Sequence, residues 1–167
     1  MPYQLFRDHF PQIAEPETRS ITVLEGANRG LPAAEYHFLE MFCNEKGCDC
    51  RRVIFSVVSS ITESIEAQVG WGWEDQEFYA NWMKYGEKTL AAQMKGPDLN
   101  MGSPQTELAP AILKLTETVL LNDGDYIERV KRHYEMFRAK VDGRGKMRTT
   151  PKVKKKTRKP RPMKRRL

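Results

Sequence analysis

The sequence predicts an α+β fold, in which a small antiparallel β-meander of three or four strands carries helices packed on one face. Three observations predict it. Aromatic and β-branched runs dominate residues 36–73, which is typical of strands. After Asp75 the apolar residues recur with helical spacing instead. Short connections between the runs favour antiparallel neighbours, and strands followed by helices along the chain are typical of α+β domains.

The N-terminal part contributes a short helix and a first strand. Residues 3–10 favour the helix, which we expect Pro11 and Pro16 to interrupt. Residues 20–25 (SITVLE) favour a strand next to the meander. The loop that follows carries two glycines and a proline.

Three consecutive strands form the predicted meander. They cover 36–43 (YHFLEMFC), 52–59 (RVIFSVVS) and 64–73. A turn at 44–47 joins the first two strands, so the end of one lies beside the start of the next.

Four helices are expected in the C-terminal half. The first three cover 77–85, 87–94 and 107–121, and the third places an apolar stripe on one side. A polar cap at Asn122 or Asp123 begins the last helix, which ends near Val141. The inward face of this helix includes His133.

Charge divides the chain into two parts. Residues 144–167 contain thirteen Lys and Arg and no acidic residue. Residues 1–143 therefore contain the other 15 basic residues and all 22 acidic ones, which gives them a net charge of −7. We therefore predict an α+β zinc-binding domain at 1–143 and a basic tail at 144–167. The basic tail has too few apolar groups to offset its ordering entropy, so we expect it to be disordered in isolation.

Three cysteines lie within eight residues, as Cys43, Cys48 and Cys50 in the pattern C-x4-C-x-C. The predicted hairpin gathers their sulfurs at one end. Thiolates are preferred ligands of Zn²⁺, which takes four ligands in structural sites. The sequence therefore predicts a structural zinc site that stabilises the hairpin, with ordinary or redox-active thiols and a catalytic metal as the alternatives.

A fourth ligand must come from elsewhere in the chain. His37 lies six residues before Cys43 on the same strand, roughly 20 Å away. A last helix docked on the sheet can instead present His133, which we expect to be the ligand. A carboxylate such as Asp49, or water, is the alternative, and His133 also fits an ordinary hydrogen-bonded core residue.

Four segments carry a family resemblance: YHFLEMFCNEKGCDCRRVIFSVVS, WGW, PQTELAPAILKL and DYIERVKRHYEMFR. Across residues 20–140 the chain resembles an uncharacterised bacterial protein family with a Cys-x4-Cys-x-Cys-Arg-Arg segment. The resemblance implies that Cys43, Cys48, Cys50 and His133 belong to the family's recurrent pattern, in line with a metal site. Some members carry a C-terminal SEC-C zinc motif, also found at the end of the preprotein-translocation ATPase. This chain has no cysteines of that motif after residue 140.

Basic residues are the candidate nucleic-acid contacts, because each cation that neutralises a phosphate releases counterions. In the basic tail they are Arg144, Lys146, Arg148, Lys152, Lys154, Lys155, Lys156, Arg158, Lys159, Arg161, Lys164, Arg165 and Arg166. Further candidate contacts in residues 1–143 could form a basic patch next to the tail. They are Arg51 and Arg52, beside the cysteines, and Lys131 and Arg132, which we expect with Arg138 on or near the exposed side of the last helix. The alternative for the helix cations is pairing with acids such as Glu128 and Glu135 across helical turns. The alternatives for the tail are binding to an acidic protein surface and a role in solubility alone.

The common catalytic signatures G-x-S-x-G, G-x4-G-K-[ST] and H-E-x-x-H do not occur. We therefore expect no enzyme, but a zinc-stabilised accessory protein that binds DNA or RNA or joins a larger protein or ribonucleoprotein complex. A protein–protein adaptor with an acidic binding body is the alternative, and a thiol-based redox sensor is a weaker one. The sequence has neither an 18-residue apolar stretch nor a signal-peptide core, so we expect a cytoplasmic protein without membrane contact.

Overall fold

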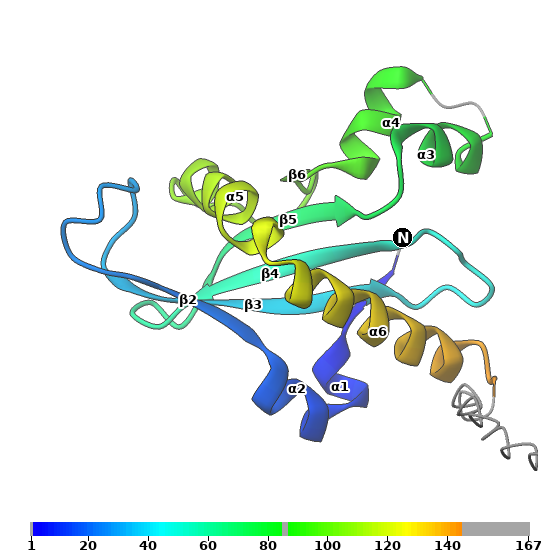
Figure 1. Ribbon diagram of the computed structural model, residues 1–167, viewed down its shortest axis with the longest axis horizontal. Coiled ribbons are helices and arrows are strands. Elements are labelled where there is room, and N and C mark those ends of the chain that lie inside the picture. The colour runs from blue at the N-terminus through cyan, green and yellow to red at the C-terminus, as the bar shows by residue number, and fades with distance from the viewer. Residues whose placement is uncertain (1, 85–86, 145–167) are drawn as a thin grey trace, which may run out of the picture.

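The computed structural model describes residues 2–84 and 87–144 (Figure 1). The prediction of a disordered tail falls almost wholly outside this range, because only Arg144 of the basic tail is described. Within the described residues, no helix is long and apolar enough to cross a membrane.

An antiparallel sheet of six strands forms the centre of the described fold, which confirms the α+β class. The strands are β1 (Tyr3–Leu5), β2 (Arg19–Val23), β3 (Ala34–Cys43), β4 (Arg52–Ser59), β5 (Ile65–Gly72) and β6 (Asp98–Leu99). The predicted meander corresponds to β3, β4 and β5, which pair in that order. The sheet is larger than predicted because β1 and β2 pair with the two halves of β3, and β6 pairs with β5.

Six α-helices accompany the sheet: α1 (Phe6–His9), α2 (Pro11–Glu17), α3 (Gln76–Trp82), α4 (Lys88–Lys95), α5 (Ala109–Thr118) and α6 (Gly124–Val141). A short 3-10 turn, η1 (Leu120–Asn122), links α5 to α6. Of the two predicted caps, Asp123 is the one that accepts a hydrogen bond at the start of α6, from the Tyr126 backbone N–H at 3.1 Å.

The N-terminal segment differs from its prediction. Residues 3–5 form β1 rather than part of a helix, since their backbone pairs with the last residues of β3. Pro11 begins α2 instead of interrupting a helix, because the first helical position needs no backbone N–H. Pro16 lies inside the last turn of this helix.

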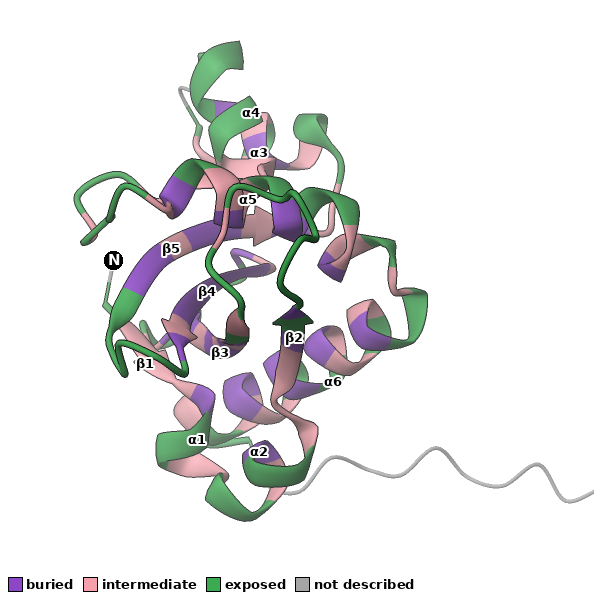
Figure 2. Cartoon of the chain, turned by 90° about the vertical axis from the view of Figure 1, so that its left-hand side faces the viewer, coloured by how far each residue is buried: buried purple, intermediate pink, exposed green. Residues whose placement is uncertain are grey.

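The core lies between the sheet and helix α6, which runs across β3 and β4 (Figure 1). Phe42 of β3 packs against Phe137 of α6 with ring centroids 5.6 Å apart, and Phe55 of β4 packs against Tyr126 at 6.3 Å. Burying each such ring stabilises the fold by roughly 1.5–3 kcal/mol. Buried residues accordingly line the strands and the side of α6 that faces them (Figure 2). This packing brings the C-terminal end of α6 to the β3–β4 loop.

Candidate metal centre

The β3–β4 loop brings the three cysteines together. Cys43 is the last residue of β3, and Cys48 and Cys50 lie in the loop before Arg52 begins β4. Their Sγ atoms all lie within 4.8 Å of one another, and all three are free thiols. Cys43 and Cys50 are fully buried, whereas Cys48 is half-buried. These three residues, the cysteine cluster, could therefore hold a metal ion.

Local hydrogen bonds shape the loop around the cysteine cluster. A turn closes with the Cys48 N–H donating to the Glu45 carbonyl at 3.2 Å. Arg51 has a left-handed backbone (φ 47°), which costs energy in a residue other than glycine. Its N–H donates to the Tyr134 hydroxyl at 3.2 Å, and its carbonyl accepts from the Tyr79 hydroxyl at 2.8 Å. These two bonds hold the turn that directs Cys50 inward.

Helix α6 fastens the same loop through a buried cation. The Arg138 guanidinium donates to the backbone carbonyls of Cys43, Glu45 and Cys48, the last two at 2.8 Å each. One turn later, Asp142 accepts the Gly47 N–H at 2.8 Å. Arg138 was expected on the exposed side of the helix, but its residue is only 3% exposed. The sequence contains a signal for this, because Arg138 follows Tyr134 by four residues on the apolar stripe.

Hydrogen bonds within the cysteine cluster, together with burial, separate the three thiol pKa values. The hydrogen bond from Cys50 lowers the pKa of Cys43 against the opposing effect of burial, with help from the Glu45 backbone N–H, from Cys48 and from the Arg138 charge. The same interaction with Cys43, followed by burial, raises the pKa of Cys50. Burial, followed by the charge of Cys43, raises the pKa of Cys48. Of the three thiols, Cys43 is therefore the one whose pKa is lowered.

The sulfur positions suit zinc. Tetrahedral coordination with Zn–S bonds of roughly 2.3 Å places neighbouring sulfurs roughly 3.8 Å apart. The sulfurs already lie within 4.8 Å of one another, so shifts of about an ångström would complete this geometry. Binding would release the remaining thiol protons, because only thiolates coordinate zinc.

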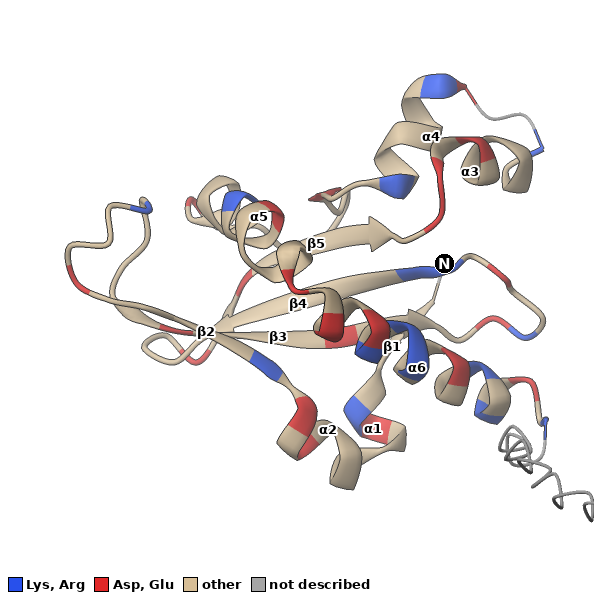
Figure 3. Ribbon diagram, in the orientation of Figure 1, with Lys and Arg blue, Asp and Glu red and all other residues tan. Residues whose placement is uncertain are grey.

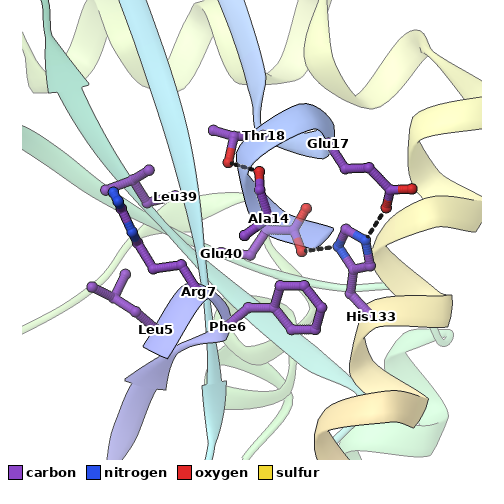
Figure 4. Close-up of a pocket in the computed structure, with 9 residues that line it drawn as sticks. All are labelled: Leu5, Phe6, Arg7, Ala14, Glu17, Thr18, Leu39, Glu40 and His133. Carbon is purple, nitrogen blue, oxygen red and sulfur yellow. Dashed lines mark hydrogen bonds and ion pairs between the residues drawn. The ribbon is translucent and has the colours of Figure 1, made fainter. Parts of the chain in front are cut away.

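His133 does not join the cysteines, contrary to the prediction. Its Nδ1 lies 2.6 Å from a Glu40 carboxylate oxygen, and its Nε2 lies 2.5 Å from a Glu17 carboxylate oxygen (Figure 4). Its ring stacks on Phe6 with centroids 4.2 Å apart. The reason is the register along α6: Arg138, about 7.5 Å further along the helix axis, reaches the loop instead. His133 is the hydrogen-bonded core residue that the sequence left as the other interpretation.

Glu17 and Glu40 are partners that the sequence did not indicate. Burial raises the pKa of Glu17, but hydrogen bonds from His133 and Arg132 outweigh this and hold that pKa below its usual value. Glu40 also accepts the Tyr126 hydroxyl at 3.0 Å. The only signal was a glutamate at an inward position of β3, between Phe38 and Phe42.

Asp49 and the two remaining histidines also lie outside the group formed by the three sulfurs. Asp49, the alternative fourth ligand, accepts two hydrogen bonds from the Arg51 guanidinium, at 3.0 and 2.9 Å. His37 contacts Ser20 at 2.6 Å, which agrees with its exclusion on distance. His9 contacts Gln4 at 3.0 Å. Among the described residues, no histidine or carboxylate belongs to the group of three cysteines that could hold a metal.

The basic candidates of the folded part are all engaged. Arg51 pairs with Asp49 at 2.9 Å and with Glu74 at 3.1 Å. The remaining ion pairs join Lys131 to Glu128, Arg132 to Glu17 and Arg144 to Asp142. Arg52 is buried, and it donates to the Met94 carbonyl and the Tyr3 hydroxyl, so it is unsuited to contact nucleic acid, contrary to the prediction. The tail candidates at 146–166 lie outside the described residues.

A groove of about 490 Å³ lies beside Cys48. Its walls include the aromatic rings of Trp73 and Tyr134, which meet edge to face at 5.0 Å. Its charged residues are of both signs: Arg51, Lys131, Arg138, Arg144, Asp49, Glu74 and Glu135. Basic and acidic positions likewise alternate along α6 (Figure 3). We call this feature the Cys48 groove.

No protein-family model, curated protein or solved structure matches this chain. The family resemblance thus stays a prediction, and the cysteine cluster is interpreted from its own geometry.

Proposed function

We propose that the protein is a non-catalytic, zinc-stabilised accessory protein that binds nucleic acid or a ribonucleoprotein through its basic tail. In this proposal the cysteine cluster holds Zn²⁺, which locks the β3–β4 hairpin against α6. The basic tail supplies the phosphate contacts, and the acidic body does not wrap the nucleic acid.

The observation that supports this division is the junction between the loop and the end of α6. Arg138 and Asp142 bind backbone groups of the cysteine loop, and Arg144, the first residue of the basic tail, pairs with the same Asp142 at 2.9 Å. A metal at the cysteine cluster would therefore stiffen the point from which the basic tail leaves the domain.

Salt dependence is the physical signature of such binding. If the tail neutralises several phosphates, log affinity falls linearly with log salt, with a slope of about −0.9 per phosphate for duplex DNA and about −0.7 for single strands. The folded part would contribute little, since its net charge is −7 over residues 1–143.

The test compares the full chain with two variants. One is cut after residue 143, and the other keeps its length but carries Gln at the thirteen basic tail positions. We expect both to lose most of their affinity for a duplex DNA and a single-stranded RNA, measured by fluorescence anisotropy at 50–200 mM salt. Equal affinity and equal salt slopes in all three proteins would contradict the proposal. A protein partner that both variants capture as well as the full chain does would favour the adaptor.

A further inference from the structure

We infer that three thiolates of this chain hold the zinc ion and that a neutral donor from outside the chain fills its fourth coordination position. The donor is an exchangeable one, namely water in the free protein or an imidazole-type nitrogen, and it enters through the Cys48 groove. This inference rests on the proposed zinc site and adds its ligand chemistry.

The chain offers no fourth residue in the right place. All three histidines are engaged elsewhere: His9 with Gln4, His37 with Ser20, and His133 with two glutamates. No described aspartate or glutamate joins the three sulfurs either. The remaining residues, 1, 85–86 and 145–167, contain no Cys, His, Asp or Glu in their sequence.

Recruiting His133 would break a completed arrangement. Its ring bridges Glu40 and Glu17, and leaving the buried Glu40 carboxylate without this partner is strongly unfavourable. Asp49 is the nearer rival, because it lies between Cys48 and Cys50 in the sequence. Its carboxylate, however, accepts both donors of a forked Arg51 contact, a geometry that is among the stronger side-chain hydrogen bonds.

The tyrosines around Cys50 are also committed. The Tyr3 hydroxyl accepts from the Arg52 guanidinium at 3.3 Å, and the Tyr79 hydroxyl donates to the Arg51 carbonyl at 2.8 Å. The Tyr134 hydroxyl accepts the Arg51 N–H at 3.2 Å. These contacts hold the loop, and a metal bond to any of the three hydroxyls would disrupt them.

Among the described residues, Cys48 marks the route by which an external donor can reach the cluster. Cys43 and Cys50 are fully buried, so the cluster meets solvent at Cys48. Cys48 lines the groove of about 490 Å³. That volume is many times the roughly 30 Å³ that a water molecule occupies in the liquid, so a small ring can enter.

Charge selects a neutral donor over an anion. Zn²⁺ with three thiolates carries a net charge of −1, which the buried Arg138 guanidinium beside the loop offsets. An anionic fourth ligand would raise this to −2, and the groove has no further net positive charge to offset it, because its other three cations, Arg51, Lys131 and Arg144, are matched by Asp49, Glu74 and Glu135. Like charges at close range repel, so water or a neutral nitrogen base is favoured.

The test uses the full chain loaded with one equivalent of Co²⁺, whose visible absorption reports its ligands, and titrates imidazole. We expect bands of a tetrahedral three-sulfur site that shift on saturation with one imidazole per cobalt. X-ray absorption of the zinc form should show three sulfurs at roughly 2.3 Å and one lighter atom at roughly 2.0–2.1 Å. Asp49→Asn should leave both spectra unchanged, whereas Cys48→Ser should remove one sulfur.

Three results would overturn the inference. Bands that ignore imidazole would mean that the fourth position is closed. A changed spectrum in Asp49→Asn would identify Asp49 as the ligand, and four sulfurs in the zinc form would indicate a site shared with a second copy of the chain. In each case the zinc site of the proposed function would survive, whereas failure to bind Co²⁺ or Zn²⁺ at all would remove both.

Discussion

Two polar clusters lie along the same contact between β3 and α6, and they differ in completeness. The first is the carboxylate–histidine cluster of Glu17, Glu40 and His133. In it, each ring nitrogen of His133 lies within hydrogen-bond distance of a carboxylate oxygen. The second is the cysteine cluster, where three sulfurs converge without a fourth protein ligand among the described residues. On β3 the two clusters are only three positions apart, at Glu40 and Cys43.

The space next to each cluster also differs in volume. The cavity at the carboxylate–histidine cluster measures about 10 Å³, which is the minimum that one water needs. The Cys48 groove is about 490 Å³ and reaches solvent. A satisfied cluster stabilises the fold, whereas a cluster without a fourth protein ligand beside a groove is suited to bind something. The comparison teaches that burial of polar groups alone does not identify a functional site.

Removing zinc should give the largest effect. With free zinc at about 1,000 times its dissociation constant, binding stabilises the folded state by about 4 kcal/mol. We therefore expect a chelator to lower the unfolding temperature of the wild type markedly but to leave that of Cys50→Ser nearly unchanged. Differential scanning fluorimetry with and without zinc measures this. If the chelator left the unfolding temperature of the wild type unchanged, the cysteine cluster would be a purely structural set of thiols.

His133→Ala should have the next largest effect, about 3 kcal/mol of lost stability, because it leaves the buried Glu40 with only the Tyr126 hydroxyl as a partner. Zinc stoichiometry should not change. His37→Ala is the matched control, since the side-chain hydrogen bond of His37 described in the structure is the one with Ser20, and its loss should cost about 1 kcal/mol. Urea unfolding with parallel metal analysis checks both. Loss of zinc from a folded His133→Ala protein would show that His133 contributes to the zinc site, and the two clusters would then not be separate.

Acid should weaken the carboxylate–histidine cluster through Glu17. Its pKa in the folded protein lies below the ordinary value of 4.5, because the hydrogen bonds from His133 and Arg132 outweigh burial. Its contribution is therefore present above about pH 4.5 and is lost as the pH falls through the lowered folded value.

Glu17→Gln should accordingly lose stability at neutral pH and converge with the wild type in acid. Glu15→Gln, at an exposed position of the same helix, should run parallel to the wild type. Free energies of unfolding between pH 3 and 7 provide the measurement. A constant gap between Glu17→Gln and the wild type across this range would exclude the linkage.

Asp142→Ala should give the smallest effect. It removes the acceptor of the Gly47 N–H, which costs about 1 kcal/mol. Because Asp142 supports the loop without contacting the sulfurs, zinc affinity should fall by 10-fold to 100-fold at most, as for outer-shell partners. Competition with a zinc-binding dye measures the affinity. A fall as large as that of Cys50→Ser would make Asp142 part of the metal site.

Much of the fold could be predicted from local patterns. The β-branched run of β4 and the aromatic run of β3 determined the central hairpin, and β4 has the predicted bounds. The strands β1 and β6 escaped prediction because they have three and two residues, too few for a periodic signal. Their position depends on pairing with distant strands.

The candidate site could likewise be predicted only where it depends on local sequence. The convergence of the cysteines follows from hairpin geometry, which the sequence carries locally. The partner of His133 depends instead on how α2, β3 and α6 meet, and residues 17, 40 and 133 are far apart in the chain. The helical spacing of apolar residues could place His133 on the inward face of α6. It could not show how far along the helix axis His133 lies, and therefore whether it reaches Glu40 or the cysteines.

The central claim is that the cysteine cluster binds one zinc ion, and native mass spectrometry of the full chain tests it most directly. We expect one zinc per chain, lost on substitution of any of the three cysteines by Ser and retained in His133→Gln. A zinc-free chain whose mass is lower by two hydrogen atoms would instead indicate a disulfide, formed by a two-electron oxidation, and favour the redox sensor. A zinc-free, fully reduced chain in zinc-containing buffer would contradict the claim outright.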